Sequence, residues 1–143
     1  MREYFKKRRA EKAEAGFTLM ELIVVLVILG MLAAVVGPKI YDKIGQGRDQ
    51  IAKLQIGELE SALMLYSFDT GRFPTTAEGL QALVQNPSGM DAWKGPYLKK
   101  GVPLDPWQKP YVYKSPGDYD DFDICSVGAD GIEGTDDDIC SWK

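Results

Sequence analysis

The chain contains no histidine, and this absence removes the commonest general base and the commonest zinc ligand of proteins. It also lacks a glycine-rich phosphate-binding loop, because Gly45 and Gly47 are not followed by the third glycine that a dinucleotide-binding loop needs. Without histidine there is no Ser-His-Asp set for nucleophilic catalysis. The sequence therefore predicts that the protein is not an enzyme.

Basic residues are concentrated at the start of the chain. The first 16 positions hold six Lys or Arg and three Asp or Glu, so the total net charge of −4 leaves −7 for residues 17–143. Such an acidic remainder argues against nucleic-acid binding, which needs a basic surface. Beyond the apolar segment described next, about 100 residues remain, enough for one small domain.

One long apolar run follows the basic segment. No charged residue occurs between Leu22 and Val36, and as a helix the run from Phe17 would be roughly 30 Å long, enough to cross a bilayer. The basic flank before it should stay in the cytoplasm. The small residue Gly16 precedes the apolar core, so cleavage there would leave the membrane helix on the mature protein. We expect a leader at 1–16, a membrane helix at 17–37 and a periplasmic domain at 38–143.

Glu21 is the one carboxylate near the start of the apolar run. A charge inside a membrane span is costly, so its presence suggests a partner. Cleavage after Gly16 would create an α-amino group at Phe17, one helical turn away, and this amine could neutralise the Glu21 of a neighbouring subunit. The alternative is that Glu21 reaches the interface and is solvated there.

The helix is expected to continue well past the membrane. Gly37 and Pro38 predict a kink or a local opening. Gly45 and Gly47 weaken the next turns, and the alternative there is a helix that ends and restarts. After them, apolar residues recur at steps of four and three and predict one buried stripe. The stripe consists of Ala52, Ile56, Leu59, Leu63 and Tyr66. Gly71 is expected to form the C-cap of this helix.

The rest of the chain predicts a short helix and three strands. Thr75 and Glu78 have the spacing of a capping box, and the helix after them should close at Asn86-Pro87. Alternating patterns predict strands at 109–114, 121–127 and 139–142. The first strand should carry Tyr111 and Tyr113 on one side, and the second Phe122 and Ile124. The expected fold class is α+β, with a long helix packed on a small antiparallel sheet.

The segment from Gly16 to Glu21, with the apolar run after it, closely resembles the class III signal of type IV pilins and type II secretion pseudopilins. The resemblance implies a type IV pilin-like fold, cleavage after Gly16 by a prepilin peptidase, and N-methylation of Phe17. The stretches 72–83, 103–107 and 126–139 resemble the major pseudopilin family of type II secretion.

This resemblance implies a structural subunit that polymerises through its N-terminal helix into a periplasmic pseudopilus, which drives the export of folded proteins. The implied location is the inner membrane, crossed once, with the C-terminal domain in the periplasm. The implied partners are other copies of the chain, minor pseudopilins, the inner-membrane assembly platform, the prepilin peptidase and the membrane. Glu60 and Lys100 resemble a charge pair between neighbouring subunits.

The acidic tail permits two interpretations on its residues alone. Carboxylates near several glycines are flexible and oxygen-rich, as calcium prefers, but the spacing is not that of an EF-hand. A solvated acidic turn is the alternative. The resemblance implies a terminal calcium loop whose ligands are the carbonyl of Val127 and the carboxylates of Asp130, Asp137 and Asp138. We expect such a loop to be ordered with calcium and mobile without it.

Cys125 and Cys140 depart from the pattern of the family that the chain resembles, in which no such cysteine pair is expected. They bracket the acidic tail on strands expected to be adjacent, in a domain expected outside the cytoplasm, where disulfides persist. A bridge would close a loop of about 15 residues and contribute roughly 3 kcal/mol in the chain-entropy model. Two free thiols are the alternative.

Two other functions remain open from the sequence. One is a type IV pilin that forms a surface filament, and the other is a monomeric, membrane-anchored calcium-binding domain. Glu21 separates the polymer from the monomer, because only a polymer offers this carboxylate a partner.

Overall fold

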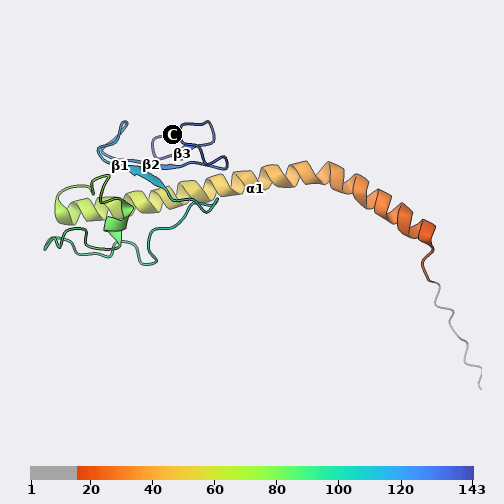
Figure 1. Cartoon of the computed structure of the whole chain (residues 1–143), viewed down its shortest axis with the longest axis horizontal. Coiled ribbons are helices and arrows are strands. Elements are labelled where there is room, and N and C mark those ends of the chain that lie inside the picture. Colours follow the sequence, from red (N-terminus) through yellow and green to blue (C-terminus); the bar gives the residue numbers. More distant parts are fainter. Residues whose placement is uncertain (1–15) are drawn as a thin grey trace, which may run out of the picture. The chain divides into compact units, whose positions relative to one another are not determined.

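The computed structural model describes residues 16–143, and its elements are traced in Figure 1. Helix α1 spans Leu19–Thr70, the 3₁₀ helix η1 spans Leu80–Leu83, and the strands are β1 (Val112–Lys114), β2 (Asp123–Ser126) and β3 (Ile139–Cys140). The chain divides into two compact units, one up to Ile40 and one from Tyr41 to Lys143. The expected basic leader lies outside the described residues, except for Gly16. A long helix and a small antiparallel sheet confirm the predicted α+β class.

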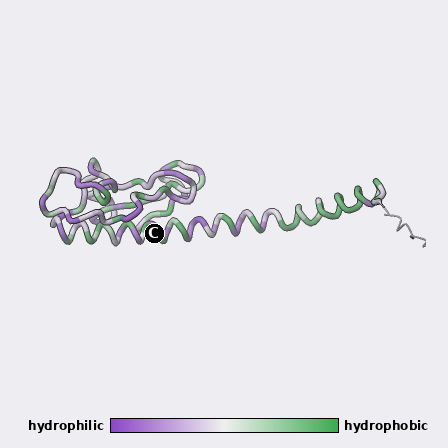
Figure 2. The backbone as a smooth tube through the Cα atoms, turned by 90° about the horizontal axis from the view of Figure 1, so that it is seen from below, coloured by the Kyte–Doolittle hydropathy of each residue, from purple (hydrophilic) through white to green (hydrophobic). Residues whose placement is uncertain are grey.

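The first unit contains the apolar part of α1. Thr18 caps the helix, since its hydroxyl accepts from the amide of Glu21 at 3.1 Å and its carbonyl accepts from the amide of Leu22 at 3.1 Å. Figure 2 shows this stretch as the continuous apolar part of the tube. Its most apolar 18-residue window has a mean hydropathy of 2.9 and buries no residue, which makes α1 a candidate membrane span.

Helix α1 runs without a break through the positions where the sequence favoured an interruption. Pro38 lies inside the helix, and Gly45 and Gly47 are helical as well. The alternative of a helix that ends and restarts is therefore wrong, and the residues around Pro38 stay helical. Each glycine costs only about 1 kcal/mol relative to alanine. Nucleating a second helix would cost roughly 4 kcal/mol, so continuation is favoured.

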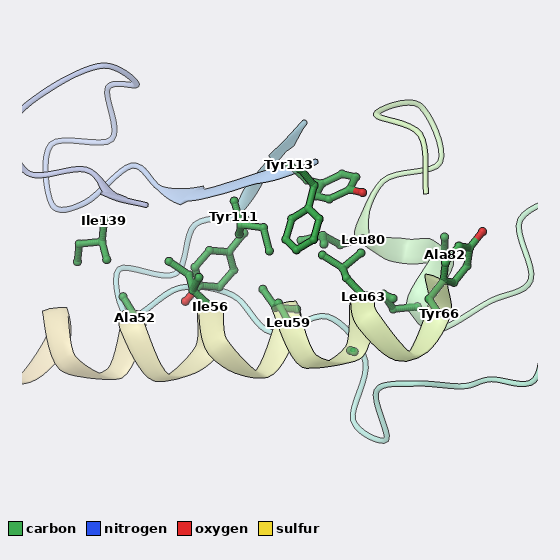
Figure 3. Close-up of a cluster of buried hydrophobic side chains, with 14 residues drawn as sticks. Ala52, Ile56, Leu59, Leu63, Tyr66, Leu80, Ala82, Tyr111, Tyr113 and Ile139 are labelled. Carbon is green, nitrogen blue, oxygen red and sulfur yellow. The ribbon is translucent and has the colours of Figure 1, made fainter. Parts of the chain in front are cut away.

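The core of the second unit lies along one face of α1. All five residues of the predicted stripe are buried, and Leu59, Leu63 and Tyr66 have no exposed surface. Figure 3 shows them beneath Tyr111 and Tyr113, beside the 3₁₀ helix. Burial of each large apolar side chain contributes about 1.5–3 kcal/mol. The stripe therefore anchors this part of α1 in the core of the second unit.

The sheet is antiparallel, with the order β1-β2-β3. Cys125 lies at its centre, opposite Val112 on one side and Cys140 on the other. All three strands are shorter than predicted. The first is shortened because Asp105 takes both backbone groups of Lys109: the Lys109 carbonyl accepts from the Asp105 amide at 2.8 Å, and the Lys109 amide donates to Asp105 Oδ1 at 2.8 Å. Tyr111 and Tyr113 are nevertheless both buried, as the alternation predicted.

The segment after α1 forms the predicted capping box but not the predicted helix. The Thr75 amide donates to Glu78 Oε2 at 2.8 Å, and the Glu78 amide donates to Thr75 Oγ1 at 3.3 Å. Gly79, with φ of 63°, then turns the chain away from a helical path. The helix is limited to four 3₁₀ residues because loop donors take its carbonyls: Trp93 Nε1 bonds Ala82 and the Tyr97 amide bonds Leu83.

Candidate functional site

The predicted processing site lies immediately before the helix. Gly16 and Phe17 are exposed and precede the first turn, and the Phe17 side chain is 83% exposed. Glu21 lies in that first turn and is also exposed. Within residues 16–143 the Glu21 carboxylate forms no ion pair. A cleaved chain would therefore present an amine and an unpaired carboxylate one turn apart at the end of an apolar helix.

The predicted pair of Glu60 and Lys100 is not formed within the chain. Glu60 is half-buried on α1, and burial, followed by the nearby Asp120 carboxylate, raises its pKa. Lys100 is exposed and lines an open cavity of about 340 Å³ together with Glu58. Within one chain, Lys100 therefore shares a cavity with Glu58 rather than with Glu60, and the charged neighbour of Glu60 is Asp120.

We define the acidic loop as residues 127–138, the connection between β2 and β3. Its ends are joined by a disulfide between Cys125 and Cys140, whose Cα atoms are 4.1 Å apart. The two cysteines are directly opposed in the sheet, and the next pair is Ser126 with Ile139. Covalent and backbone bonds thus hold both ends of the loop at one place.

Each predicted calcium-binding carboxylate bonds a backbone amide of the loop. Asp130 Oδ1 accepts from the Ile132 amide at 2.8 Å, Asp137 Oδ2 from the Asp130 amide at 3.1 Å, and Asp138 Oδ2 from the Gly134 amide at 2.7 Å. Hydrogen bonds from the Thr135 hydroxyl, and then from the Asp130 amide, lower the pKa of Asp137. Asp130 and Asp137 are exposed, whereas Asp138 is buried.

The loop matches the preference of calcium in the chemical type of its donor atoms. It offers only oxygen donors, and the carboxylates of Asp137 and Asp138 both reach the hydroxyl of Thr135, at 2.5 Å and 3.5 Å. The Val127 carbonyl accepts from the Gly131 amide at 3.2 Å. Across residues 16–143, no three metal-ligating side chains converge on one point. The donors suit calcium in kind, while their present partners are amides of the loop.

Asp105 is a structural residue of this region that sequence reasoning missed. It is 1% exposed; its Oδ1 accepts from the amides of Trp107 at 3.0 Å and Lys109 at 2.8 Å, and its Oδ2 accepts from Ser126 Oγ at 2.6 Å. Ser126 Oγ in turn accepts from the Gly128 amide at 3.3 Å. The signal was the Asp-Pro pair at 105–106, which is typical of a turn held by the aspartate side chain.

Two family models match the chain. Residues 39–142 match the family of type II secretion system protein G, and residues 12–37 match the prokaryotic N-terminal methylation motif. These two ranges divide the chain close to the boundary between the two compact units.

Relatives and a solved structure agree with the family models. The chain is 44% identical to type II secretion system core protein G of Pseudomonas aeruginosa, over 92% of this chain and 96% of the relative. It is 43% identical to the protein of that name in Aeromonas hydrophila, over 93% and 95%. A crystal structure of the major pseudopilin from the type 2 secretion system of enterohaemorrhagic Escherichia coli matches with a TM-score of 0.63 and 36% identity, over 75% of this chain and 88% of the other. The chain therefore belongs to the type II secretion system protein G family, a family of structural pseudopilus subunits.

Proposed function

We propose that the mature chain begins at Phe17, crosses the inner membrane once, and polymerises through its N-terminal helix into a periplasmic pseudopilus that drives protein export. The observation that carries this proposal is the apolar part of α1. Its side chains are exposed throughout residues 19–36, and Glu21 is the one charged residue among them. A lipid-anchored helix explains the apolar surface, and a helical polymer also gives the carboxylate a partner.

The partner of Glu21 is the N-terminal amine of a neighbouring subunit. This amine exists only after cleavage between Gly16 and Phe17, so processing and assembly are coupled. Removing one member of a desolvated ion pair costs roughly 3–5 kcal/mol, because the other charge stays unpaired. A loss of that size at every contact stops polymerisation.

The experiment replaces Glu21 by valine and uses Glu58→Gln as the matched control, because Glu58 is an exposed glutamate farther along the same helix. Glu21→Val should leave the chain in the membrane fraction and abolish the filaments sedimented after the outer membrane is opened, whereas Glu58→Gln should assemble normally. A normal filament yield from Glu21→Val would exclude the pairing and favour a monomeric anchor.

We propose that Glu60 and Lys100 pair between neighbouring subunits. The support is that both are on the surface of the second unit and that neither is in an ion pair among the described residues. A Lys100 ammonium from a neighbouring chain would also offset the repulsion between Glu60 and Asp120. An exposed pair contributes only about 0–1 kcal/mol per contact.

We also propose that the acidic loop binds calcium through the Val127 carbonyl and the carboxylates of Asp130, Asp137 and Asp138. The support is the resemblance of the terminal segment, the all-oxygen donor set, and the proximity of Asp137 and Asp138 to one hydroxyl. Calcium supplies positive charge that offsets repulsion among the carboxylates. The Cys125–Cys140 disulfide holds the two ends of the loop together, so that calcium needs to order only the residues between them.

The remaining partners follow from the proposed assembly. A prepilin peptidase would release the leader, and minor pseudopilins and an inner-membrane assembly platform would begin and extend the polymer. The role assigned to this chain is structural rather than catalytic. Secretion should therefore fail in proportion to filament loss when assembly residues are changed.

A further inference from the structure

The Lys109 side chain ends inside the first turn of the acidic loop. Its Nζ donates to the carbonyls of Gly128 and Ala129, both at 3.2 Å. A Cβ added to Gly131 would collide with this Nζ, so the ammonium packs directly against the backbone of the turn. Gly131 has φ of 73°, and the absence of a side chain there leaves the ammonium its space.

One buried carboxylate positions both Lys109 and its targets. Asp105 Oδ1 accepts from the Lys109 amide, which fixes the start of the lysine side chain. Asp105 Oδ2 accepts from Ser126, whose hydroxyl accepts from the amide of Gly128. Because the lysine and the turn are held by the same group, little further ordering is needed for the ammonium to meet the carbonyls.

The acidic loop has five carboxylates and no basic residue of its own. They are Asp130, Glu133, Asp136, Asp137 and Asp138. Positive charge reaches the loop from outside: Lys109 bonds carbonyls at its start, and Lys143 Nζ bonds the Asp138 carbonyl at its end, at 3.3 Å. Carboxylates on one short loop repel one another, and a positive charge bonded to the backbone of that loop reduces the repulsion.

We propose that Lys109 is a positioning residue that acts as a built-in cation of the acidic loop. Its ammonium orders the turn at 128–131 without a divalent ion, and the same charge weakens calcium binding by the loop. The weakening of calcium binding rests on the proposed calcium function, whereas the ordering of the turn does not. The proposal differs from the sequence expectation, in which order of the loop depends on the metal.

The experiment uses the full chain in detergent and the variant Lys109→Met, which keeps the length and apolar stem of the side chain but removes its charge. The matched control is Lys99→Met, which removes the same charge from an exposed side chain that makes none of the loop contacts named above. Melting temperature and amide hydrogen exchange at 128–131 are measured in chelator, and calcium affinity is measured by titration.

In chelator, Lys109→Met should melt about 5 °C below the wild type and exchange faster at 128–131, as expected for loss of charge-assisted hydrogen bonds. Its calcium affinity should rise about threefold to tenfold, because a positive charge that repels the cation has left the loop. A merely structural role would not raise the affinity. Lys109→Arg keeps the charge and should restore the melting temperature and the wild-type affinity.

Each result decides the proposal. Equal melting and exchange for Lys109→Met and Lys99→Met in chelator would overturn it, as would a Lys109→Arg variant no better than Lys109→Met. If Lys109→Met is destabilised in chelator but no form of the chain responds to calcium, the lysine's role is upheld and the calcium function is refuted. If Lys109→Met does not fold, folding of Lys109→Arg upholds the need for the cation, and its failure to fold overturns it.

Discussion

The ion pair of Arg72 and Glu78 offers a pH-dependent test of how the segment after α1 is held. The two side chains bond in a bidentate manner, with both N–O distances at 2.7 Å, and Glu78 also accepts from the Thr75 amide. The hydrogen bond from Arg72 is the main cause that lowers the pKa of Glu78 from 4.5 to about 2. Glu78→Gln keeps the shape of the side chain and removes its charge.

The size of the effect follows from the pKa and from exposure. A fully shielded shift from 4.5 to about 2 would correspond to roughly 3 kcal/mol of stability. The Arg72 side chain is 40% exposed, so screening by solvent reduces this to about 1–2 kcal/mol. For a domain of about 100 residues this corresponds to a fall in melting temperature of about 5–10 °C at pH 7.

The pH dependence has a definite sign. Because the folded-state pKa of Glu78 is lowered, its contribution is fully present above the unfolded pKa of about 4.5 and is lost as the pH falls through about 2. Thermal melts by circular dichroism from pH 7 to pH 2 should show the gap between wild type and Glu78→Gln closing between pH 4.5 and 2. The control Glu58→Gln should show no such gap. A gap that is absent at pH 7, or unchanged at pH 2, would refute the assignment.

The remaining predictions concern the proposed metal site and the proposed contact between subunits. Calcium should raise the melting temperature of the wild type by an amount equivalent to about 2.7 kcal/mol at one hundred times the dissociation constant, and Asp138→Asn should abolish this rise. Identical melts of the wild type in calcium and in chelator, with the disulfide both oxidised and reduced, would contradict the calcium site. Reversing the charge of Glu60 or of Lys100 alone should lower filament yield, and reversing both should restore it; two single variants that assemble like the wild type would dismiss the pair.

The parts of the fold that depend on local periodicity were predictable from the sequence. Ala52 to Tyr66 recur at helical spacing, and all five residues of that stripe are buried. The alternation around Tyr111 and Tyr113 located β1, and the spacing of Thr75 and Glu78 predicted a capping box that the structure contains. These features are decided by neighbours within a few positions of the chain.

The parts that depend on distant partners were not predictable in this way. The 3₁₀ helix is short because Trp93 and Tyr97 take carbonyls of Ala82 and Leu83, from 11 to 14 positions away. Asp105 is buried because Ser126, 21 positions later, satisfies its second oxygen. A single sequence contains no periodic signal for such pairings. The same reason hid the contact between Lys109 and the acidic loop.

The central claim is that processing at Gly16 creates the end through which subunits assemble. Intact-mass spectrometry of protein from filaments that are sedimented after the outer membrane is opened tests it most directly. The account predicts a chain that begins at Phe17 and carries one additional methyl group on its amine. Filament protein that retains Met1 at its N-terminus would contradict the account.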